Sequence, residues 1–72
     1  IDAERALEQA LVQAERAGDL TLRPMPTYGL GAIVWARGDL PAAEARWREA
    51  VALAERCHDD RALGFGFNGL GI

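Results

Sequence analysis

The feature that most constrains the fold of this chain is an internal repeat with an offset of forty residues. When the chain is compared with itself at that offset, ten of the thirty-two aligned pairs are identical. Glu15-Arg16 aligns with Glu55-Arg56, and Gly29-Leu30-Gly31 aligns with Gly69-Leu70-Gly71. Matches between alanines carry little weight in an alanine-rich sequence, whereas the Gly-Leu-Gly match is more specific. A repeat of about 20–50 residues is typical of arrays in which each unit is one supersecondary element.

The spacing of the apolar residues predicts that each unit consists of helices. Ala43, Trp47, Ala50 and Ala54 are separated by four, three and four residues, which places them on one helical face. The earlier unit has Ala3, Leu7, Ala10 and Ala14 at the same spacing. Asp39 is a predicted N-cap with Pro41 in the following turn, while Pro24 and Pro26 are expected to exclude regular helix before Thr27. We predict an all-α fold, an α-solenoid of antiparallel helix pairs, with helices at approximately residues 2–18, 27–37, 41–57 and 61–72.

The last segment, RALGFGFNGLGI at residues 61–72, contains four glycines, and the repeat predicts that it is nevertheless a helix. Each glycine costs about 1 kcal/mol relative to alanine inside a helix. Such a helix therefore needs burial between neighbouring helices, on two sides, where a missing Cβ lets backbones approach closely. The alternative, an irregular end of the chain, stays open at this point.

Composition and charge exclude several classes of protein. Seventy-two residues make one small domain, and the single cysteine cannot form an internal disulfide. The net charge is −3 and the basic residues form no stripe, so direct binding to nucleic acid is not expected. No apolar stretch reaches the length of a membrane span. We expect a cytoplasmic protein, and the absence of an initiator methionine suggests a piece of a longer one.

Candidate chemical sites are few. Cys57-His58-Asp59-Asp60 is the one cluster of metal-ligating residue types, but a structural zinc site needs four ligands with paired spacing. The chain contains no lysine, so a Gly-Lys-Ser/Thr phosphate loop is absent. We therefore expect no metal, no cofactor and no enzymatic activity in this chain.

The segment LGAIVWARGDLPAAEARWREAVALAER resembles a tetratricopeptide repeat, in the longer, forty-residue variety found in scaffold proteins and in large bacterial transcriptional activators of the MalT and AfsR kind. It departs from the family pattern at Thr27, where a large residue is usual, and it lacks the usual proline at the end of the repeat. The positions that match the family pattern are Ala3, Leu7, Ala10, Leu30, Gly31, Gly38, Ala43, Trp47, Ala50, Leu70 and Gly71.

The resemblance implies a function in protein–protein interaction. In such arrays the first helix of each unit lines a concave groove, and the groove would bind a peptide, a partner protein or another domain of the same chain. An alternative is that the chain is the sensor section of a large bacterial transcriptional regulator, and self-association through exposed end faces is a further expectation. The resemblance assigns to the groove Tyr28, Ala32, Trp35, Asn68 and Ile72, with packing between repeats as the competing role for Tyr28, Trp35 and Asn68.

Overall fold

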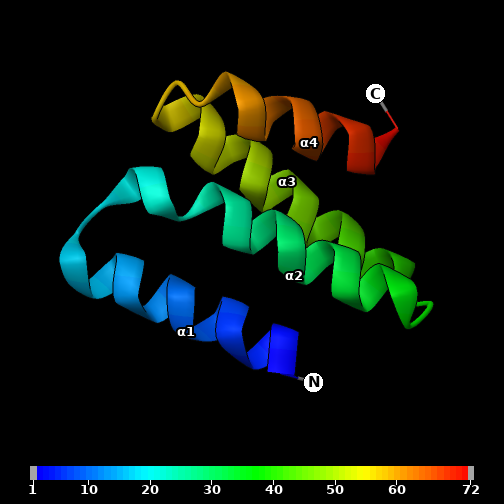
Figure 1. Ribbon diagram of the computed structural model, residues 1–72. Coiled ribbons are helices and arrows are strands. Elements are labelled where there is room, and N and C mark those ends of the chain that lie inside the picture. The colour runs from blue at the N-terminus through cyan, green and yellow to red at the C-terminus, as the bar shows by residue number, and fades with distance from the viewer. Residues whose placement is uncertain (1, 72) are drawn as a thin grey trace.

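The computed structural model describes residues 2–71. It contains four α-helices, which are α1 (Asp2–Ala17), α2 (Pro24–Ala36), α3 (Leu40–Arg56) and α4 (Asp60–Leu70), and one short 3₁₀ helix, η1 (Leu20–Leu22), between α1 and α2 (Figure 1). The predicted all-α fold with four helices is confirmed.

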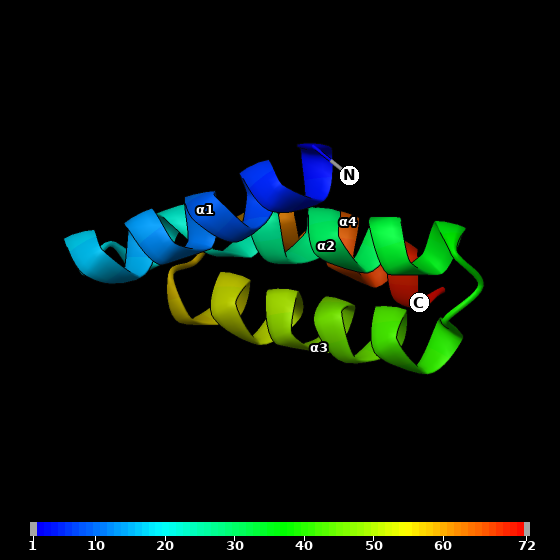
Figure 2. The ribbon, with the colours of Figure 1, turned by 90° about the horizontal axis from the view of Figure 1, so that it is seen from below.

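The helices form two layers of unequal size. α1, α2 and α4 follow one another across one layer, and α3 packs from the other side between α2 and α4 (Figures 1 and 2). α2 contacts the other three helices, whereas no Cα of α1 lies within 8 Å of a Cα in α3 or α4. The Cα atoms accordingly fill a flat volume of 32 × 28 × 15 Å. The forty-residue offset makes α1 the equivalent of α3, yet their positions differ because α3 is held between two helices and α1 has only α2 beside it.

The start of α2 contradicts the sequence-based boundary. The helix begins at Pro24 and not at Thr27, so the expectation that two prolines exclude helix there is wrong. The N–H groups of a first helical turn have no partner within the helix, and prolines in that turn lose no hydrogen bond. Thr27 is the first residue whose N–H is used, and it donates to the carbonyl of Arg23 at 3.2 Å. The Thr27 hydroxyl donates to the same carbonyl at 2.8 Å.

The end of α4 also differs from its prediction. The helix ends at Leu70, and Gly71 is its C-cap with a φ of +79°. The expectation that Gly71 repeats the role of Gly31 inside a helix is therefore wrong, because a left-handed residue closes the helix instead of extending it. Ile72 lies outside the described residues.

The core lies mainly between α2 and α3. Ala43, Trp47, Ala50 and Leu30 are buried, as the repeat pattern predicts. The residues of α1 that stand forty positions before Ala43, Trp47 and Ala50 are less covered. Leu7 and Ala10 are half-buried, and Ala3 is exposed. Leu70 is half-buried, and Gly38 forms the turn between α2 and α3 with a φ of +87°.

The forty-residue offset is preserved in the turns that end α1 and α3. The N–H of Asp19 donates to the carbonyl of Ala14 at 3.1 Å, and the N–H of Asp59 donates to that of Ala54 at 2.9 Å. The residue before each aspartate has a positive φ, +67° at Gly18 and +57° at His58. The turn that ends α2 has the same arrangement, with a hydrogen bond from the Asp39 N–H to the Val34 carbonyl at 3.0 Å and a positive φ at Gly38, so it is common to all three turns.

Candidate binding groove

The floor of the groove between α2 and α4 is the indole of Trp47, which α3 contributes from below. A Cβ added to Gly31 in α2 would lie 2.5 Å from Trp47 Nε1, and one added to Gly69 in α4 would lie 2.7 Å from Trp47 Cδ2. Both distances are too short for real atoms, so only glycine fits on either side of the ring. Trp47 Nε1 donates a hydrogen bond to the Tyr28 carbonyl oxygen at 3.2 Å, which fixes the ring in this slot.

The same kind of contact occurs one repeat earlier. A Cβ on Gly29 of α2 would lie 2.9 Å from Leu7 Cδ1 of α1. Leu7 and Gly29 stand forty residues before Trp47 and Gly69. The contact between α1 and α2 therefore uses the same repeat positions as the contact between α3 and α4. The close approach expected of the glycines is thus confirmed at these sites.

The expectation of close packing on two sides of α4 is not met in the described residues. A Cβ on Gly66 would lie 2.5 Å from Val51 Cγ2 of α3, and Gly69 contacts Trp47 on the same side. By contrast, a Cβ on Gly64 or Gly71 would meet no atom within 4 Å. The face of α4 that carries Gly64 and Gly71 is therefore open.

A pocket of about 320 Å³ lies above Trp47. Four of the five residues that the sequence assigns to the groove come together around it. The pocket is lined by Tyr28, Ala32 and Trp35 of α2, by Asn68 and Gly69 of α4, and by Trp47. The fifth, Ile72, lies outside the described residues.

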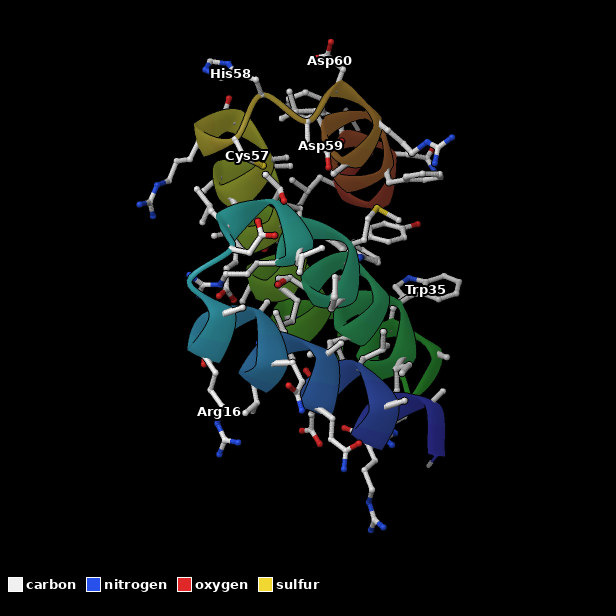
Figure 3. All side chains as sticks on the ribbon, turned by 60° about the vertical axis from the view of Figure 1, so that its left-hand side comes forward. Arg16, Trp35, Cys57, His58, Asp59 and Asp60 are labelled. Carbon is white, nitrogen blue, oxygen red and sulfur yellow. The ribbon has the colours of Figure 1, made fainter. Side chains whose placement is uncertain are left out.

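A second hollow, of about 360 Å³, shares Trp35, Trp47 and Gly69 with the first. Its remaining lining residues are Leu40, Pro41, Glu44 and Leu70. Sequence reasoning missed the three residues from α3, because only the tertiary structure brings the beginning of α3 beside the end of α4. Trp35 borders both hollows, is 55% exposed and points away from the helices into solvent (Figure 3).

Aromatic rings continue along this surface. The Tyr28 ring stacks on that of Trp47 with a centroid distance of 6.3 Å, and the Phe65 ring lies 5.6 Å from Tyr28. Phe65 is 42% exposed. α2 contains no charged residue, and the only charged residues of α4 are Asp60 and Arg61 in its first turn. The α2–α4 surface therefore offers aromatic rings, small side chains and the Asn68 amide to a partner.

The cluster Cys57-His58-Asp59-Asp60 comprises the turn between α3 and α4 and the first residue of α4. Asp59 Oδ1 accepts a hydrogen bond from the Ala62 N–H at 3.0 Å and so caps α4. His58 and Asp60 are exposed and point away from the molecule (Figure 3), while Cys57 is half-buried. Among residues 2–71, no three His, Cys, Asp or Glu side chains are close enough together to hold a metal ion.

Charged side chains lie mainly on α1 and α3, and among them Glu44 borders the second hollow. Arg37, at the end of α2, donates two hydrogen bonds to the Glu4 carboxylate of α1, at 2.6 and 3.2 Å. This hydrogen bonding lowers the pKa of Glu4 below its ordinary value and raises that of Arg37. Arg48 and Glu44 form an ion pair on α3 at 3.2 Å. Such exposed pairs contribute little to stability.

Within residues 2–71, none of the helices is both long and apolar enough to cross a membrane. No family model matches the sequence, and no curated protein or solved structure matches it either. The fold and the groove define this chain as an all-α domain of four helices with an aromatic pocket between two of them.

Proposed function

We propose that this chain is a protein-interaction module of the tetratricopeptide type, whose α2–α4 groove binds an extended peptide of a partner protein. The observation that carries the proposal is the pocket of about 320 Å³ in which Tyr28, Trp35 and Asn68 meet above the buried Trp47. Pockets for ligands are mostly apolar, with a few polar groups that fix orientation. Asn68 supplies that polar group, because its amide can both donate to and accept from a peptide backbone.

Two features support an array of repeats as the scaffold of this groove. The contact of Leu7 with Gly29 recurs as that of Trp47 with Gly69. α2 and α4, which would be the first helices of successive units, also lie side by side on the surface that carries the pocket. An exposed aromatic surface of this kind is typical of sites that contact other proteins.

Selection of peptides from a random phage-displayed library against the chain tests this proposal. We expect selected peptides to bind the wild-type chain and to lose at least about tenfold in affinity for Trp35→Ala, because interface aromatic residues dominate binding energy. Trp35 is largely exposed, so this variant should keep the wild-type helix content and unfolding midpoint.

Arg16→Ala is a control, since Arg16 is an exposed residue of α1 that lies outside both hollows. It should bind the selected peptides as the wild-type chain does. Peptides that bind wild type, Trp35→Ala and Asn68→Ala with equal affinity would show that the groove is not the binding site.

A further inference from the structure

The pocket above Trp47 is bordered by two aromatic rings from one face of α2. Tyr28 and Trp35 are seven residues apart, which is two helical turns, or about 10.5 Å along the helix axis. The other residues that α2 and α4 contribute beside them include the small Ala32 and Gly69, which leave the volume of about 320 Å³ open. The pocket therefore offers a ligand two aromatic rings at this spacing.

That spacing matches the period of one extended peptide conformation. A polyproline II helix has three residues per turn and a rise of about 3.1 Å per residue, so residues i and i+3 leave the same side about 9 Å apart. Side chains on one face of a β-strand recur about every 6.7 Å, so one interval is too short and two are too long. Prolines three residues apart therefore match Tyr28 and Trp35 better than the side chains of a strand do.

The polar groups around the pocket also fit a proline-rich backbone. The indole N–H of Trp35 can only donate a hydrogen bond, and the Asn68 amide and the Tyr28 hydroxyl can donate as well. Trp35 and Asn68 are exposed, so both are accessible to a ligand. Consecutive prolines present carbonyl acceptors and no N–H groups, so they bring no backbone donor that needs a partner in the groove. Aromatic-lined grooves in other folds recognise proline-rich peptides in this way.

The charges around the groove determine which charge the peptide carries and where. Among residues 2–71, no charged side chain lines the pocket above Trp47, so a charged group of the peptide would be buried there without a partner. Glu44 lines the adjoining second hollow together with Trp35. Arg48 pairs with Glu44 at 3.2 Å, yet the Glu44 side chain is 57% exposed and open to a second cation. A cation in the second hollow therefore has a carboxylate and an aromatic ring beside it.

We propose that the partner segment bound by the α2–α4 groove is a proline-rich peptide in the polyproline II conformation, with a basic residue at one end. Its prolines contact Tyr28 and Trp35, and its basic side chain lies beside Glu44. The inference rests on the proposed peptide-binding function and adds the chemistry of the peptide. Because proline-rich segments already adopt this conformation when free, they lose less conformational entropy on binding than other peptides do.

Isothermal titration calorimetry with defined peptides tests the proposal. The probes are Ac-PPAPPAPPR-NH2 and Ac-RPPAPPAPP-NH2, because either end of the peptide can face Glu44. At least one of them should bind the wild-type chain, and it should lose at least about tenfold in affinity when its prolines are replaced by alanine. Trp35→Ala should lose a similar factor, since interface aromatic residues dominate binding energy.

Glu44→Gln tests the place of the basic residue. It should weaken binding of the arginine-containing peptide by about two- to fivefold, the range expected for an exposed ion pair, and it should reduce the loss of affinity at high salt. Glu55→Gln is the matched control, because Glu55 is an exposed glutamate of the same helix that lies outside both hollows. It should bind the peptide as the wild-type chain does.

The outcomes separate this inference from the proposed function. Equal affinity for the proline and alanine peptides would overturn the inference, and so would proline peptides that bind Trp35→Ala as tightly as wild type. Unchanged affinity in Glu44→Gln would overturn the position given to the basic residue. If peptides selected from the random library depend on Trp35, contain no proline and bind at least about tenfold tighter than both probes, the inference fails while the proposed function stands. If neither the probes nor any selected peptide binds, both fail.

Discussion

Replacement of Gly31 by alanine tests whether the Trp47 slot determines how α2 packs on α3. The added Cβ would lie 2.5 Å from Trp47 Nε1 and 2.6 Å from Cδ1, so the indole must move. Overpacking of this kind costs about 1–3 kcal/mol. Loss of the hydrogen bond from Trp47 to the Tyr28 carbonyl costs about 1 kcal/mol more. Alanine in place of glycine inside a helix returns about 1 kcal/mol. We therefore expect Gly31→Ala to lower the free energy of unfolding by about 1–3 kcal/mol.

Gly64→Ala is the matched control, since it makes the same chemical change in a helix with open space around it. It should raise the free energy of unfolding by about 1 kcal/mol. Urea unfolding followed by circular dichroism at two protein concentrations measures both variants and reveals any contribution from association. A Gly31→Ala chain as stable as Gly64→Ala would refute the reasoning, because it would show that the indole can shift at no cost.

Three further predictions concern the helix ends and the charged pair. Asp59→Ala removes the N-cap of α4 and should lower the free energy of unfolding, measured by thermal unfolding, by about 1 kcal/mol. Asp59→Asn should keep most of the wild-type stability, because asparagine is also a good N-cap. His58→Gly should raise the free energy of unfolding by about 0.5–1 kcal/mol, because His58 holds a φ of +57° that glycine adopts freely. An unchanged unfolding midpoint would contradict this. The lowered pKa of Glu4 means that the native state favours its charged form, so its stabilising effect is present above the ordinary pKa of 4.5 and is lost as the pH falls below that value. The protection of the α1 amides relative to their intrinsic exchange rates should therefore decline below pH 4.5 in the wild-type chain, and Glu4→Gln should reduce this decline.

The helices could be predicted from the sequence because their signals are local. Alanine-rich segments with apolar residues at helical spacing, and aspartates that cap the following helix, act within a few residues of one another. Asp39 caps α3 as predicted, through a hydrogen bond from the Ala42 N–H. Even the glycine-rich segment could be assigned as a helix, because the forty-residue offset compares it with a segment that has fewer glycines. The start of α2 does not follow from the sequence pattern, because proline usually breaks a helix but is tolerated in its first turn.

The tetratricopeptide resemblance assigned Tyr28, Ala32 and Trp35 to one groove, and these residues of α2 do line one pocket. The sequence also suggested Asn68 opposite them, through the repeat. It gave no sign that Leu40, Pro41 and Glu44 border a second hollow, because that contact joins the start of α3 to the end of α4.

The sequence by itself determined that the chain forms four helices and that Asp39 caps α3, because these features depend on residues close together in the chain. Only the tertiary structure decided which glycines are close contacts and which are open. Gly31 and Gly69 enclose one indole, while a Cβ on Gly64 or Gly71 would meet no atom of the described residues within 4 Å. The distinction depends on which helix lies opposite each glycine. That depends on how α3 packs between α2 and α4, which no local pattern in the sequence specifies.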